Sequence, residues 1–155
     1  MINKLSRKGA DVLTAAAADS LLVVSSLSQK EVERLVEGAY RRQGYQVSQI
    51  GAAAQSESAM LLTKASQRVL LQCKYWKTRK LAEMPVRELY GMMAAQSANG
   101  GILITSGTFT LEASRFAGYG HIQLIDGPRL LLLLRQSEAP QAPGAQLQRG
   151  SAAAR

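Results

Sequence analysis

The chain has 155 residues and a formal net charge of +8, from 19 Lys and Arg against 11 Asp and Glu. This length suits one domain with its own hydrophobic core. No apolar run reaches the roughly 18 residues of a membrane-spanning helix, because the run from Val12 to Val24 is short and contains Asp19. One cysteine, Cys73, and one histidine exclude an internal disulfide and a structural zinc site of the usual Cys/His type. We therefore expect a basic, globular, cytoplasmic domain that does not enter a membrane.

Three regions differ in composition. Residues 1–27 begin with basic residues and continue through an Ala-rich stretch, which predicts an N-terminal arm or an extra helix. Residues 28–135 carry the helical and alternating apolar patterns of a folded domain. From residue 136 onward, prolines and small residues without apolar periodicity predict a disordered tail, 136–155.

The folded region opens with a helix followed by three strands. Ser28 and Glu31 form a capping box at the start of the helix. The predicted apolar face of this helix comprises Val32, Leu35, Val36 and Tyr40. Alternating residues then predict a strand over 45–50, and a hairpin whose strands cover 60–63 and 69–75.

Helices and strands alternate in the second half of the region. Pro85 predicts the start of a helix that Asn99, Gly100 and Gly101 stop. The predicted apolar face of this helix comprises Val86, Leu89, Tyr90, Met93 and Ala94. A buried strand follows over 102–104, and a third helix begins near residue 110.

A final strand over 121–125 and a last helix through Leu130–Leu134 complete the domain. The order is helix, three strands, helix, strand, helix, strand, helix. Strands that follow one another directly, and strands that are joined through helices, together imply a mixed sheet with helices on both faces. We therefore expect an α/β fold with a central sheet of about five strands.

Two polar side chains lie in the otherwise apolar strand 69–75. Successive side chains alternate between the faces of a strand, so Gln72 and Lys74 share one face while Leu71 and Cys73 share the other. Cys73 is then expected in the core. An amide and a lysine are unfavourable to bury without partners. The pair indicates either a functional site or a solvated edge strand.

Two further groups are candidates for binding phosphate. Basic residues dominate the segment 74–87, which has Glu83 as its single acidic residue and includes Tyr75 and Trp76. Its basic residues are Lys74, Lys77, Arg79, Lys80 and Arg87. This segment predicts either a phosphate-binding surface or a solvated loop. The hydroxyl residues Ser106, Thr108 and Thr110 precede a helix, where phosphate binding and turn or capping roles explain them equally well.

Four sequence segments follow one another in the order found in one nuclease family. They are QxK at 72–74, VREL-G at 86–91, TSGxFT at 105–110 and LIDG at 124–127. Together they resemble the Mrr-type restriction endonucleases, a branch of the PD-(D/E)xK nuclease superfamily. The resemblance extends from about Val32 to Leu134. It implies the restriction-endonuclease-like fold, DNA as substrate, and Mg²⁺-dependent hydrolysis of phosphodiester bonds.

The resemblance also implies roles for individual residues. Such nucleases hold the cation with acidic or amide oxygens, while a lysine orients or helps deprotonate the attacking water. The cation must both activate water and neutralise charge on the phosphate. By position, Gln72 corresponds to a metal ligand and Lys74 to the lysine. Glu33 falls where family members often carry an acidic residue near the metal.

The aspartate that the resemblance implies on the second strand is missing. Counting back from Gln72 places Gln55 and Ala59 at the two family aspartates, and neither supplies a carboxylate. Glu57 lies two residues before Ala59, so a two-residue shift of strand register would bring its carboxylate to that place. The alternative is that Glu57 belongs to a solvated loop.

Two functions therefore stay open. The first is a DNA-binding endonuclease that cleaves with Lys74, Gln72 and either Glu57 or Glu33. The second is a catalytically inactive module of the same fold that binds DNA or a protein partner. The expected DNA contacts are Lys77, Arg79, Lys80, Arg87, Ser106, Thr108 and Thr110. Cutting both strands of a duplex would require two such sites, which is consistent with a homodimer.

Overall fold

The computed structural model describes residues 26–51, 59–74 and 80–138, and its main sheet has five strands. In spatial order these are β1 (Gln46–Ile50), β2 (Ala59–Lys64), β3 (Gln67–Cys73), β5 (Gly100–Ile104) and β7 (Ile122–Ile125). β2 is antiparallel to both β1 and β3, whereas β3, β5 and β7 are parallel. The predicted mixed sheet and the predicted hairpin are therefore confirmed.

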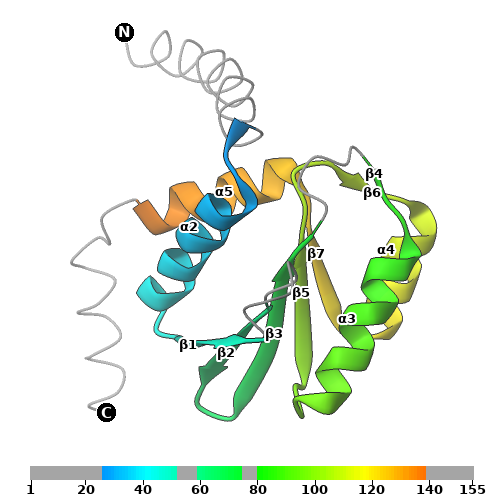
Figure 1. Ribbon diagram of the computed structural model, residues 1–155, viewed down its shortest axis with the longest axis horizontal. Helices are drawn as coiled ribbons and strands as arrows, with labels where there is room; N and C mark the ends of the chain where they lie inside the picture. The colour runs from blue at the N-terminus through cyan, green and yellow to red at the C-terminus, as the bar shows by residue number, and fades with distance from the viewer. Residues whose placement is uncertain (1–25, 52–58, 75–79, 139–155) are drawn as a thin grey trace, which may run out of the picture.

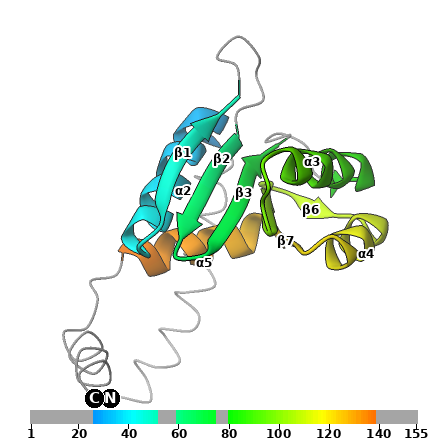
Figure 2. The ribbon, with the colours of Figure 1, turned by 90° about the horizontal axis from the view of Figure 1, so that it is seen from below.

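Helices cover both faces of this sheet, as the order of elements predicted (Figures 1 and 2). One face carries α2 (Gln29–Arg42) and α5 (Gly127–Glu138), and the other carries α3 (Glu83–Ala95) and α4 (Leu111–Tyr119). Each pair of helices packs over its own apolar cluster of sheet residues. Within the described ranges, no helix has both the length and the apolar content to span a bilayer.

The start of α2 matches its sequence signature. The Ser28 hydroxyl accepts a hydrogen bond from the Glu31 amide at 3.2 Å, and the Glu31 carboxylate accepts one from the Ser28 amide at 2.7 Å. Val32, Val36 and Tyr40 are buried as expected, but Leu35 is 42% exposed. The predicted apolar face was wrong at Leu35, because Ala39 rather than Leu35 completes the stripe that packs inward.

The helix predicted to begin at Pro85 begins two residues earlier, at Glu83. Proline is tolerated there because amide groups in the first turn of a helix have no intrahelical partner. Gly100 and Gly101 belong to β5 and do not stop the helix. A Cβ atom at Gly101 would lie 2.6 Å from the sulfur of Met93, so the glycine lets α3 pack closely on the sheet.

The buried face of α3 is narrower than the sequence suggested, since Val86, Leu89 and Met93 are buried but Tyr90 and Ala94 are exposed. Two short strands were also missed. β4 (Lys80–Leu81) and β6 (Thr108–Phe109) pair in parallel and form a separate ribbon. Two residues are too few to show an alternating pattern.

The ends of the domain differ slightly from the predicted boundaries. α5 runs to Glu138, so residues 136–138 of the predicted tail are helical. The remainder of that tail, 139–155, lies outside the described residues. The same holds for residues 1–25 of the predicted N-terminal arm.

Candidate functional site

The candidate site lies where β3 ends, on the face of the sheet that α3 covers. Leu70 belongs to the apolar cluster under α3 and α4, whereas Leu71 and Cys73 belong to the cluster under α2 and α5. By strand alternation, Gln72 and Lys74 share the face of Leu70. Both are buried, with exposed fractions of 0% and 4%. The edge-strand alternative is therefore wrong, because β3 lies between β2 and β5.

Strand pairing fixes which residue faces Gln72. Ala59 is the Cα partner of Gln72 in the antiparallel pair of β2 and β3, so both side chains lie on the same face. The buried side chain across from Gln72 is thus a methyl group. The two-residue register shift considered for Glu57 does not occur in the described pairs of β2 and β3. Glu57 and Gln55 themselves lie outside the described residues.

The side-chain amide of Gln72 is buried without a hydrogen-bond partner in the part of the chain that the structure describes. This holds for both Nε2 and Oε1. An unpaired buried polar group lowers stability by about 1–3 kcal/mol, and such groups are rare in native proteins. The amide is therefore available to a ligand on the face that Lys74 shares.

Lys74 forms an ion pair with Glu88 of α3, a residue that the sequence analysis missed. Its Nζ donates to Oε2 of Glu88, and its backbone amide donates to the carbonyl of Ile104 at 3.0 Å. The Glu88 side chain is 44% exposed, so this carboxylate reaches both the buried lysine and solvent. Glu88 lies within the VREL segment, but the sequence alone does not show where α3 crosses β3.

Beside the end of β3, the end of β5 contributes a buried hydroxyl group. Cys73 and Ile104 are Cα partners in the parallel pair of β3 and β5, so Lys74 and Thr105 follow them side by side. Thr105 is fully buried, and its hydroxyl accepts a hydrogen bond from the Gly107 amide at 3.4 Å. This contact helps to fix the turn that leads into β6.

The predicted metal ligand Glu33 reaches the end of β3 from the other face of the sheet. Gln29, on the same helix, donates one hydrogen bond to Glu33 Oε1 at 3.1 Å and one to the carbonyl of Cys73 at 3.0 Å. Burial raises the pKa of the Cys73 thiol, and the nearby Glu33 carboxylate raises it further. Cys73 is therefore a protonated core residue, and Glu33 lies close to it on the α2 side.

Two of the predicted DNA contacts lie together in the small ribbon. Lys80 of β4 and Thr108 of β6 are Cα partners, and both are exposed. Ser106 lies in the turn between Thr105 and this ribbon. Lys77 and Arg79 lie outside the described residues.

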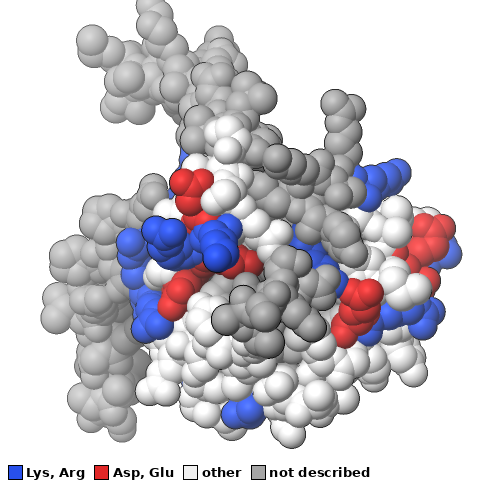
Figure 3. Space-filling view, viewed as in Figure 1, with Lys and Arg blue, Asp and Glu red and all other residues white. Residues whose placement is uncertain are grey.

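The other two predicted contacts already have partners within the protein. The Thr110 hydroxyl caps α4 by accepting from the Ala113 amide at 3.1 Å. The Arg87 guanidinium donates to Glu83 at 3.0 Å and stacks over the Phe116 ring at 4.5 Å. Basic and acidic side chains are interspersed on the visible face of the molecule, over α2 and over α3 and α4 (Figure 3).

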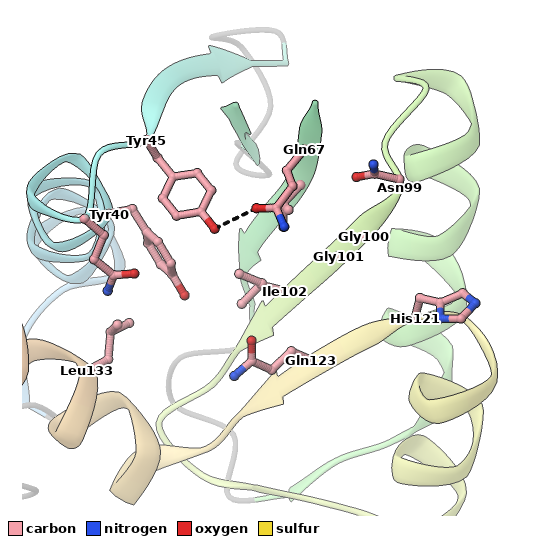
Figure 4. Close-up of a pocket in the computed structure, with 12 residues that line it drawn as sticks. Tyr40, Tyr45, Gln67, Asn99, Gly100, Gly101, Ile102, His121, Gln123 and Leu133 are labelled. Atoms are coloured by element: carbon pink, nitrogen blue, oxygen red, sulfur yellow. Dashed lines mark hydrogen bonds between the residues drawn. The ribbon is translucent and has the colours of Figure 1, made fainter. Parts of the chain in front are cut away.

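A separate hollow lies at the opposite ends of the same strands and on the opposite face. It has a volume of about 610 Å³ and is lined by Tyr and amide side chains, among them Tyr45, Gln67 and Gln123 (Figure 4). The Tyr45 hydroxyl bonds to the Gln67 side chain at 3.2 Å. Its lining includes none of Gln72, Lys74 and Glu88, so this hollow is not part of the candidate site.

The donor atoms at the site can be compared with what Mg²⁺ requires. This cation takes oxygen ligands and is commonly bound through one or two carboxylates together with substrate phosphates and water. Among the described residues, no three His, Cys, Asp or Glu side chains come together. The unpaired Gln72 amide and the Glu88 carboxylate nevertheless provide two kinds of oxygen ligand beside Lys74. The residues fit a cation on the condition that Glu88 takes part.

The chain has a mixed sheet with helices on both faces and a buried polar pair where the central strand β3 ends. Comparison with family models identifies the class of protein. The family model described as restriction endonuclease, of the Mrr type, matches residues 24–134. The chain belongs to this restriction endonuclease family. The resemblance inferred from the sequence is thereby confirmed.

Comparisons with whole proteins are more distant. No curated protein is similar enough in sequence to match the chain. The apo structure of EndoMS is 18% identical, with a TM-score of 0.48, over 64% of this chain and 45% of that one. A protein of unknown function is 13% identical, with a TM-score of 0.48, over 59% and 57%. The MspJI restriction endonuclease in complex with a 27-mer oligonucleotide is 15% identical, with a TM-score of 0.44, over 76% and 31%.

Proposed function

We propose that this protein binds DNA and hydrolyses its phosphodiester bonds with the help of a divalent cation such as Mg²⁺. The observation that carries the proposal is the buried pair Gln72 and Lys74, in which the Gln72 amide has no partner among the described residues. Membership of the restriction endonuclease family supports it. The activity is proposed for the domain itself, since the chain spans 45% and 57% of the first two similar structures.

The proposed roles follow from the position of each group. Lys74, held in place by its ion pair and by the backbone of β5, would orient the attacking water as an ammonium group or, after giving up its own proton, take one from that water. Gln72 would bind the cation through its amide oxygen. The cation would supply activation of the water and neutralisation of charge on the phosphate.

The proposed DNA surface is centred on the β4–β6 ribbon. Lys80 and Thr108 are exposed side by side there, and Ser106 lies two residues before Thr108. Lys77 and Arg79 belong to the segment that joins Lys74 to this ribbon, and we assign them the same role from the sequence. We also propose that the protein forms a homodimer, which would place one site on each strand of the duplex. Its proposed location is the cytoplasm.

A plasmid-nicking assay tests the proposal. Wild type with Mg²⁺ or Mn²⁺ should convert supercoiled plasmid to the relaxed form, and EDTA should stop the reaction. Lys74→Ala should lower the rate by about 100-fold or more, which is the usual contribution of a positioned acid–base group. Lys64→Ala is the matched control, because Lys64 lies at the far end of β2 and donates to the carbonyl of Gln43. Absence of nicking by wild type, or equal nicking by Lys74→Ala, would refute the hydrolytic proposal.

A second function is favoured by one observation, the methyl group of Ala59 across from Gln72. In this case the domain binds DNA without cleaving it. DNA affinity would then fall with salt at a log–log slope of about −0.9 per phosphate contact, with no nicking by wild type. Nicking gained by Ala59→Asp in an otherwise inactive protein would support this second function directly.

A further inference from the structure

We propose that Glu88 supplies the carboxylate of the cation site, from α3, in place of the missing carboxylate on β2. This inference rests on the proposed function and names the ligand set of the same site. The cation would be held by the Glu88 carboxylate and the Gln72 amide oxygen, with Lys74 beside them.

The first argument is the packing of α3 on the sheet. Val86, Leu89 and Met93 bury one side of α3 against the face that carries Leu70 and Leu103. Glu88 lies next to Leu89 in the sequence, and its side chain reaches Lys74 at the edge of this interface. A carboxylate from the helix therefore arrives on the face where β2 provides only a methyl group.

The second argument concerns the contacts of the other carboxylates in the described part of the chain. Glu33 approaches from the α2 side, where it accepts a hydrogen bond from Gln29. Glu83 is paired with Arg87 at 3.0 Å. Asp126 accepts a hydrogen bond from the Arg129 amide at 3.1 Å, at the start of α5. Glu88, in contrast, forms an ion pair with Lys74.

The third argument concerns charge and access. Lys74 is almost fully buried, and a buried ammonium group needs an anionic partner. Glu88 fills this need and is still 44% exposed, so a hydrated cation approaching from solvent can reach its carboxylate. The unpaired Gln72 amide is the group that would gain most from the arrival of a cation, because burial has already removed its water.

The test uses the full chain and measures Mn²⁺ binding by isothermal titration calorimetry, without DNA. We expect Glu88→Gln to weaken Mn²⁺ binding at least tenfold relative to wild type. Glu112→Gln is the matched control, because Glu112 is an exposed acidic residue in the first turn of α4. It should bind Mn²⁺ within twofold of wild type. Equal affinities for Glu88→Gln and wild type would overturn the inference.

A second measurement needs no variant and so does not depend on whether Glu88→Gln folds. Substoichiometric Mn²⁺ added to ¹⁵N-labelled wild type should broaden the NMR signals of Glu88 and of the Gln72 side-chain amide before those of Glu33 and Glu112. Broadening that begins around Glu33, or no selective broadening at all, would contradict the assignment.

Nicking by the same variants separates the inference from the proposed function. If Lys74→Ala loses nicking while Glu88→Gln retains both nicking and Mn²⁺ binding, the hydrolytic function stands and the role of Glu88 is refuted. If wild type neither binds Mn²⁺ nor nicks DNA, the proposed function itself fails.

Discussion

The two faces of β3 differ although their residues alternate along one short segment. On the α2 and α5 face, Leu71 and Cys73 are buried among apolar neighbours. On the α3 face, Gln72 and Lys74 are buried equally well, but one has no partner among the described residues and the other relies on Glu88. One face of the strand therefore stabilises the fold, while the other holds polar groups that make no comparable contribution to stability.

This difference shows how a buried strand can carry a site. A side chain that is buried without a partner lowers the free energy of unfolding, so its presence needs a reason other than packing. The register of β2 and β3 places the small side chain of Ala59 across from Gln72, on the face that α3 covers. Substitutions on the two faces should therefore change the free energy of unfolding in opposite directions.

The largest effect is expected on the apolar face. Leu71→Ala should lower the free energy of unfolding by about 2–5 kcal/mol, because it removes a fully buried side chain and leaves a cavity under α2 and α5. Urea denaturation followed by circular dichroism measures this change. The nicking rate per folded molecule should stay close to that of wild type. A loss below about 1 kcal/mol would show that this face is not the main core.

The opposite sign is expected one residue further along. Gln72→Met replaces the unpaired amide with an apolar side chain of similar length, and should raise the free energy of unfolding by about 1–2 kcal/mol. The same variant should lose Mn²⁺ binding, so stability would rise as function falls. Destabilisation in urea would mean that the amide has a stabilising partner in solution, and the contrast between the faces would then weaken.

The smallest effect concerns the ion pair that completes the polar face. A double-mutant cycle of Lys74→Met and Glu88→Gln should give a coupling energy of about 1 kcal/mol. A larger value is not expected, because Glu88 is 44% exposed and solvent screens part of the attraction. Urea unfolding of the two single variants, the double variant and wild type measures the coupling. A coupling near zero would place the two side chains apart in solution.

Local patterns predicted most of the fold. The capping box of Ser28 and Glu31, the hairpin and the order of the helices and main-sheet strands are confirmed because each depends on neighbouring residues. Gly101 was assigned to a helix stop because its sequence context is that of a C-cap. Its role in β5 depends on the approach of Met93 from another element, which no local pattern records.

The candidate site was predicted only in part for the same reason. The period of two along β3 was enough to place Gln72 and Lys74 on one face. Counting back from Gln72 placed Ala59 at the position of a family aspartate, and the strand register shows that Ala59 lies across from Gln72. Glu88 was missed, because it lies on a helix whose crossing over β3 is set by packing, and the role of Glu33 stays a prediction.

The sequence by itself determined the family, the order of the elements and the polar pair on β3, because motifs and apolar periods are properties of short segments. Only the tertiary structure decided which carboxylate meets Lys74. α2 and α3 each bring acidic side chains toward the end of β3, and the face on which each helix packs separates them. The face on which each helix packs depends on apolar residues such as Leu89 and Val36. These residues are far along the chain from the strands that they cover.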